Sequence, residues 1–195
     1  MIPLHAQELT AFHDGQHTAT SASELWRAIE DNHRCNCRLW DEEDLARRRD
    51  VPDAEIANNK RAIDGYNQKR NDAIERIDGQ LLNLFFKTKA KPDARLNSET
   101  PGAMIDRLSI LSLKIHHMRL QTLRQDVERA HLEACEAKLA RLIEQRADLG
   151  ACLDRLLAEA ARGEAFFKVY RQFKMYNDPA LNPQLYGESS RSKRS

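Results

Sequence analysis

The chain has 195 residues, of which 41% are hydrophobic and 31% charged, with only seven Gly and six Pro. This length and composition are typical of a mainly helical globular protein and argue against a disordered or all-β chain. Because 31 Lys and Arg residues face 30 Asp and Glu residues, the formal charge is +1. That balance excludes a global basic field of the kind that recruits nucleic acid or a membrane surface, so neither partner is expected. We predict one helical domain over residues 1–187 and a basic tail over residues 188–195.

The sequence predicts a cytoplasmic protein. The opening stretch, MIPLHAQELTAFHDG, has no basic segment followed by an apolar run, so no secretory signal is expected. No apolar stretch approaches the roughly 20 residues that span a bilayer. The cysteines form neither CxxC pairs nor a dense framework, as in a reduced cytosolic chain. They are Cys35, Cys37, Cys135 and Cys152.

Two helices are expected in the first half of the chain. The first runs from about residue 22 to 48, because Ser21 and Glu24 can form a capping box. Pro52 interrupts the pattern and suits the first turn of the next helix, which we expect over residues 53–87.

The second half begins with a polar linker, KTKAKPDARLNSETPG, that closes at a predicted N-cap, Thr100, with Pro101 in the first helical turn. Residues 103–162 contain no proline, but the apolar stripe changes phase, so we predict two helices with a break near residues 121–126. A short aromatic helix is expected over residues 164–176. It would bury its rings and leave its cations in water, in preference to stacking on nucleic acid; the rings are Phe166, Tyr170 and Phe173. The predicted fold class is all-α: an antiparallel bundle of about five helices.

One face of the first predicted helix begins apolar and becomes polar toward its end. Ile29 lies on this face, and the following positions at helical spacing are His33, Asn36, Trp40, Glu43 or Asp44, and Arg47. Buried polar groups cost about 1–3 kcal/mol when they are unpaired, so partners are expected on neighbouring helices.

The second predicted helix carries a polar seam beside its apolar stripe. The seam residues lie within about 80° of one another, at 100° per residue: Lys60, Asp64, Asn67, Asn71, Glu75 and Asp78. In an antiparallel hairpin we expect Arg47 to meet Asp64. We also expect Glu43 to meet Lys60.

The third predicted helix has apolar strips on two sides, which predicts a central position. Asp106 and His117 fall on one of these strips, whereas Arg107 lies elsewhere on the helix surface. Because a buried Asp without a cation is rare, we expect Asp106 to meet a Lys, Arg or amide from the second helix. The converging polar residues form either a structural network or a ligand site, and the sequence leaves both open.

One cofactor, Mg²⁺, is suggested by paired carboxylates, because this ion takes oxygen ligands and usually bridges to phosphates. The candidate ligands lie on the first two helices: Glu43, Asp44, Glu75 and Asp78. The pattern resembles the all-α nucleotide pyrophosphohydrolases, which pair an EExxE helix with an ExxD helix. Ala46 and Arg47 stand where that family has its third acid.

Two weaker motifs suggest other chemistries. Glu30 with His33, and Glu128 with His131, each resemble half of a ferritin-like di-iron motif. The stretch RNDAIERIDGQLLNLF resembles the opening helix of helical chorismate mutases, although a Phe-Lys pair stands where that family has an arginine.

Four longer segments, in this order, resemble a bacterial family known as domain of unknown function 4254: NCRLWDEEDLAR, KRAIDGYNQKRNDAIERID, SETPGAMIDRLSILSLKI and FKMYNDPALNPQLY. The family's hallmark patches correspond to Arg70-Asn71-Asp72 and Leu108-Ser109-Ile110. The resemblance implies a helical protein of the bacterial cytoplasm with a link to cell-surface glycan assembly. It implies no catalytic residue.

Two functions are compatible with these patterns. The first is a binding or accessory protein whose polar seam recognises a small anionic or sugar-containing ligand, or a partner helix. The second is a Mg²⁺-dependent hydrolase or transferase acting on a nucleotide or phosphorylated substrate. The Leu-rich stretch over residues 132–157 can pair as a coiled coil within the chain or across a homodimer.

Overall fold

The computed structural model describes residues 24–170 and 180–183, and this part of the chain is mostly helical. The elements are α2 (Glu24–Leu45), α3 (Asp53–Leu84), β1 (Arg95–Asn97), α4 (Pro101–Thr122), α5 (Arg129–Ala161) and β2 (Ala165–Phe167). The mainly helical class is thus confirmed. None of the described helices combines the length and the apolar character needed to cross a membrane.

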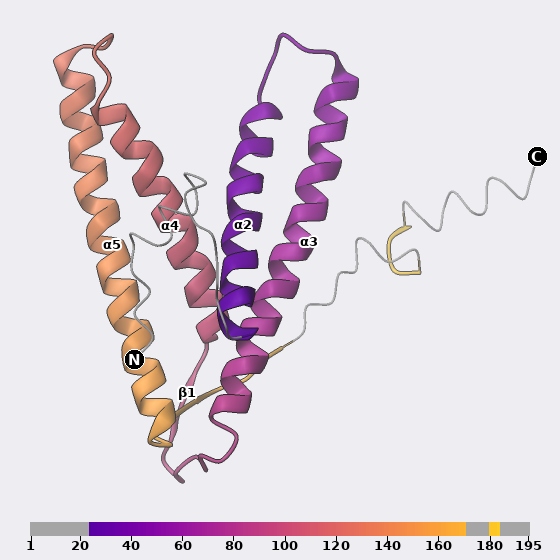
Figure 1. Cartoon of the computed structure of the whole chain (residues 1–195), viewed down its shortest axis with the longest axis vertical. Helices are drawn as coiled ribbons and strands as arrows, with labels where there is room; N and C mark the ends of the chain where they lie inside the picture. The colour runs from indigo at the N-terminus through magenta and orange to yellow at the C-terminus, as the bar shows by residue number, and fades with distance from the viewer. Residues whose placement is uncertain (1–23, 171–179, 184–195) are drawn as a thin grey trace, which may run out of the picture.

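The four described helices form two hairpins, α2 with α3 and α4 with α5 (Figure 1). The side chain of Asn59 donates to Glu42, and Arg76 donates to Asp31, so α3 runs antiparallel to α2. The hairpins lie against each other at the end that carries β1 and separate toward the turns that join their helices (Figure 1). The predicted bundle of about five helices is therefore two splayed hairpins in the described part of the chain.

The predicted start of α4 and the predicted break after it are confirmed, whereas α3 ends at Leu84, three residues before its predicted end. Thr100 accepts a hydrogen bond from the Ala103 N–H at 3.2 Å, and Pro101 occupies the first turn of α4. The predicted break between two helices falls between Thr122 and Arg129. The Ser21 capping residue and the predicted tail lie outside the described residues.

The predicted aromatic helix is wrong over its first residues, which form strand β2. Gly163 ends α5 in a left-handed conformation, with φ +71°, and a Cβ there would lie 2.4 Å from the Lys89 carbonyl oxygen. The chain then pairs in parallel with β1, in the register Arg95 with Ala165, because the linker offers free backbone donors. Tyr170, which was expected in the core, is 76% exposed. Residues 171–179, including Phe173, lie outside the described residues.

The hydrophobic core lies at the closed end of the hairpins, where all four helices and β2 meet. Its members come from the first turns of α2 and α4 and the last turns of α3 and α5: Ala28, Ile29, Ile77, Leu81, Met104, Ile105, Leu108, Leu149, Leu153 and Leu156, with Ala165 and Phe167 from β2. Burial of such side chains contributes about 1.5–3 kcal/mol each. The open end carries no comparable cluster among the described residues, which leaves its polar groups next to hollow space.

A buried carboxylate joins α3 to the beginning of α4. Asp78 accepts a hydrogen bond from the Gly102 N–H at 2.6 Å, one of the donors that the helix itself leaves unpaired. Burial raises the pKa of Asp78, and the neighbouring Glu75 adds to the rise, while hydrogen bonds from the Thr100 side chain and Gly102 oppose it. A Cβ on Gly102 would lie 2.7 Å from Asp78 Oδ1 and 2.8 Å from the Ile74 carbonyl oxygen. The two helices therefore approach this closely only because residue 102 is glycine.

We predict that Gly102→Ala lowers the free energy of unfolding by about 1–3 kcal/mol, because the added methyl group forces α3 and α4 apart. Gly65→Ala is the matched control, since nothing lies within 4 Å of a Cβ at that helical position. The control should raise stability by about 0.5–1 kcal/mol. Urea unfolding followed by circular dichroism measures both, and equal effects of the two variants would contradict the close approach.

The raised pKa of Asp78 predicts a pH-dependent effect of Asp78→Asn. The folded protein holds this proton more tightly than the unfolded chain, so the group's contribution to stability is full below its ordinary pKa and is lost as pH rises through the raised pKa. The neutral Asn has no such loss. The unfolding free energy of the variant minus that of the wild type should therefore increase from pH 4 to pH 7. A decrease over this range would show that Asp78 acts mainly as a charged helix cap.

Candidate functional site

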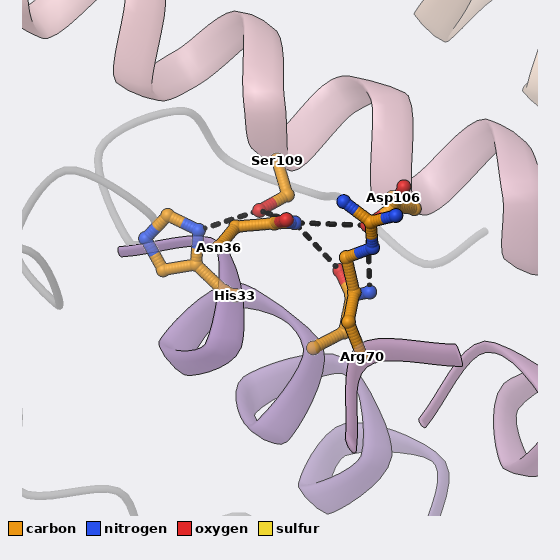
Figure 2. Close-up of polar contacts among 6 residues, drawn as sticks. His33, Asn36, Arg70, Asp106 and Ser109 are labelled. Carbon is orange, nitrogen blue, oxygen red and sulfur yellow. Dashed lines mark hydrogen bonds and ion pairs between the residues drawn. The ribbon is translucent and has the colours of Figure 1, made fainter. Parts of the chain in front are cut away.

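A network of buried polar side chains joins α2, α3 and α4 around Asp106 (Figure 2). Asp106 Oδ1 accepts hydrogen bonds from Asn32 Nδ2 at 2.8 Å and from Asn36 Nδ2 at 2.9 Å, both on α2. The whole Asp106 residue is only 8% exposed. Its carboxylate is therefore held by amide donors from the other hairpin.

Arg70 supplies the positive charge of this network. Its Nε lies 3.9 Å from Asp106 Oδ1, which is an ion-pair distance but longer than a hydrogen bond. The expectation that a cation of the second helix meets Asp106 is thus confirmed. The amides, however, come from the first helix, because Asn32 and Asn36 lie one turn apart on the face of α2 that contacts α4.

A second pair of contacts extends the network along α2. His33 Nδ1 and Ser109 Oγ are 2.8 Å apart, and Asn36 also donates to Ser109 Oγ at 3.0 Å (Figure 2). His33 is 1% exposed and Ser109 is 2% exposed, so this contact is shielded from solvent. The Sγ atom of Cys37 lies 3.7 Å from His33 Nε2. Burial raises the pKa of the Cys37 thiol to about 12, so this thiol is protonated at neutral pH. The contacts with Ser109 join α2 to α4.

Two members of the network were not among the predicted site residues. Asn32 precedes Asn36 by one helical turn and lies beside His33, so extending the polar face by four residues would have found it. Ser109 follows Asp106 by three residues, within the Leu108-Ser109-Ile110 patch. Both are short polar residues, and a helical pattern does not distinguish such residues from solvent-facing ones.

A cavity of about 340 Å³ adjoins the network toward the open end of the hairpins. It is lined by residues of α2, of the turn that follows it, of α3 and of α4: Asn36, Leu39, Trp40, Glu43, Asp44, Arg47, Asn67, Arg70, Ile110 and Leu113. Seven of these ten were predicted site residues. The structure therefore gathers the polar face of the first helix and part of the second around one hollow.

Two buried donors in the wall of this cavity lack an acceptor. Within the described residues, Trp40 Nε1 and Arg70 Nε have no hydrogen-bond partner. Each such group costs about 1–3 kcal/mol when it is shielded from water without a partner. Trp40 also stacks on His117, with ring centroids 4.1 Å apart and planes 7° from parallel. An indole N–H and a guanidinium N–H are thus held in place without acceptors of their own.

The predicted ion pairs between the first two helices are wrong. Arg47, in the turn that follows α2, pairs at 3.0 Å with Glu43, four residues earlier, and Lys60 pairs with Asp64 on α3 at 3.8 Å. The side chains of Arg47, Lys60 and Asp64 are about two thirds exposed. Residues four apart on one helix are already neighbours, so these local pairs form without any contact between helices.

The structure does not bring the four predicted Mg²⁺ ligands together. Glu43 and Asp44 lie near the end of α2, where Asn59 contacts Glu42, whereas Glu75 follows Asn59 by sixteen residues of α3. At 1.5 Å per residue, this separates the two levels by about 24 Å. Asp78 caps α4 instead. No group of three or more His, Cys, Asp or Glu residues suited to a metal occurs in the described chain.

Other predicted residues form contacts of their own. Arg107 pairs with Glu99 at the surface, and Asp72 accepts a hydrogen bond from Gln68. Asn71 lies half-buried on α3. In the ExxH pairs, His33 bonds to Ser109, and His131 lies 3.4 Å from the Cys135 sulfur.

We predict that Asp106→Ala lowers the free energy of unfolding by about 3 kcal/mol, because it leaves two amide groups and the Arg70 charge without their acceptor. Asp106→Asn retains an accepting oxygen and should therefore lower the free energy of unfolding by less than Asp106→Ala does. Urea unfolding of both variants measures the difference. A fully stable Asp106→Ala protein would contradict the structural role.

One comparison with known proteins gives a match, and it spans most of the described residues. A family model described as "Protein of unknown function (DUF4254)" matches residues 26–169. No curated protein and no solved structure matches the chain. The matched range contains α2 from its third residue onward, the other three described helices, both strands, the Asp106 network and the residues that line the first cavity. Because it covers well over half of the 195 residues, the chain belongs to the DUF4254 family of proteins of unknown function.

Proposed function

We propose that the protein is a binding or accessory protein that holds the sugar part of a small ligand in the cavity between α2, α3 and α4. The observation that carries this proposal is the pair of buried donors without acceptors, Trp40 Nε1 and Arg70 Nε, in the wall of one cavity. A ligand with several oxygen atoms would offer acceptors to the side chains of both residues. Such a ligand would lower the cost of leaving donors unpaired in the cavity wall.

The charge balance of the cavity favours a neutral polyhydroxylated group over a highly charged one. Arg47 is paired with Glu43, and Arg70 is paired with Asp106. The carboxylates and the amide oxygen of Asn67 can accept hydrogen bonds from hydroxyl groups, while the N–H groups can donate to them. The Trp40 ring and Leu113 add the apolar surface on which the C–H faces of a sugar ring can pack.

The network behind the cavity supports binding by preorganisation. Asn36 and Arg70 contribute to the cavity wall and are held from behind by Asp106. Side chains that are fixed before a ligand arrives lose less entropy when it binds. The sugar ligand agrees with the link to glycan assembly implied by the family resemblance. The four free cysteines agree with a reducing bacterial cytoplasm.

We predict that a Trp26→Phe variant, in which Trp40 is the single tryptophan, reports ligand binding by fluorescence. Titration with a panel of methyl hexosides and methyl N-acetylhexosaminides should produce a saturable change for at least one member. Asn67→Ala, in the same background, should weaken that binding by about five- to tenfold, because one hydrogen bond contributes about 1 kcal/mol.

Asn83→Ala is the matched control, since Asn83 is exposed on the same helix and does not line the cavity. It should leave the affinity unchanged. The proposal fails if no sugar alters the emission of Trp40, or if both asparagine variants weaken binding equally.

A further inference from the structure

A second cavity, of about 590 Å³, lies between α2, α4 and α5 at the open end of the hairpins. It is lined by Trp40, Asp44, Lys114, His117, Met118, Gln121, Lys138, Arg141, Leu142 and Gln145. Two of these residues, Trp40 and Asp44, also line the first cavity. The cavities therefore adjoin, and the Trp40 ring, stacked on His117, stands in the wall of both.

The two cavities differ in charge. The wall of the second cavity carries three cations, Lys114, Lys138 and Arg141, against one carboxylate, Asp44. Within the described residues, Lys114 and Lys138 form no ion pair, whereas Arg141 pairs with Glu144 at 2.8 Å. Cations gathered in a concave surface raise the local concentration of anions. The second cavity is thus suited to an anion, whereas the charges of the first are balanced by its own carboxylates.

Two further arginines lie on the helices that supply the cations of the second cavity, Arg119 on α4 and Arg146 on α5. The pKa of Arg146 on α5 is lowered by burial and, to a lesser extent, by the charge of Arg119 on α4. The charges of Arg146 and Arg119 are therefore close enough to affect each other. Lysine and arginine side chains are the usual partners of phosphate groups, as point charges and as planar forks respectively.

Resting on the proposed sugar site, we propose that the ligand is a phosphorylated sugar whose phosphate or diphosphate group is held in the second cavity by Lys114, Lys138 and Arg141. The sugar would lie in the first cavity, and the linkage would pass the Trp40 ring. Both volumes fall within the range of about 300–1,000 Å³ that is typical of small-molecule sites. The second is the larger, and it leaves room for a group attached beyond the phosphate.

The test uses inorganic pyrophosphate first, because this probe does not depend on the identity of the sugar. Calorimetric titration of the full chain should show binding that weakens as ionic strength increases. The Lys114→Gln/Lys138→Gln variant should bind at least fivefold more weakly. The matched control is Lys87→Gln/Lys89→Gln, which makes the same change of net charge at exposed positions outside the cavity. The control should bind pyrophosphate like the wild type.

The second arm compares each methyl hexoside with the corresponding hexose 1-phosphate. The phosphate should improve the affinity at least tenfold in the wild type, and the Lys114→Gln/Lys138→Gln variant should lose that gain while still binding the neutral sugar. Neutral sugar binding with no gain from phosphate overturns this inference and leaves the proposed function standing. Pyrophosphate binding that depends on both lysines, without any sugar binding, supports the anion site and overturns the proposed function. The inference is also overturned if the Lys87→Gln/Lys89→Gln control loses as much pyrophosphate affinity as the Lys114→Gln/Lys138→Gln variant.

Discussion

The arrangement of the two hairpins depends on one buried carboxylate. Asp106 lies on α4, and its donors come from α2 and α3, so the first hairpin must approach α4 at one level and in one rotation. An unpaired carboxylate at this depth would cost several kcal/mol, which makes other arrangements of the hairpins unfavourable. A hydrophobic contact alone would tolerate sliding, because apolar attraction has no preferred direction. The apolar core therefore holds the two hairpins together, and the polar network fixes their relative level and rotation.

The same network links stability to the proposed binding function. The core occupies the closed end of the hairpins, and both cavities occupy the open end. Asn36 and Arg70 belong to the junction between them, since each contacts Asp106 and each also lines the first cavity. A ligand that accepts hydrogen bonds from this junction would bridge three helices. Binding at the open end would then resist separation of the hairpins, because a ligand that binds only the folded state stabilises it.

Local sequence signals were sufficient for most element boundaries and failed where a partner far along the chain decided the conformation. Thr100, Pro101 and the phase change near residue 122 act through neighbours within a turn or two, so their effects could be predicted. Residues 165–167 have an aromatic pattern that fits a helix, yet they pair with β1, which lies some seventy residues earlier. Arg47 and Lys60 show the opposite case, because each forms an ion pair with a carboxylate four residues away and none across the hairpin.

The sequence by itself determined that the chain is helical, that α2 changes from apolar to polar along one face, and that Asp106 needs a Lys, Arg or amide partner from the second helix. Helical periodicity and the cost of burying charge act on each helix separately, so these conclusions need no knowledge of how the helices pack. Only the tertiary structure decided which donors surround Asp106, that Asp78 caps α4 instead of joining Glu43, and that Trp40 stands between two cavities of different charge. These facts depend on the rotation and level of one hairpin against the other, which no single helix specifies.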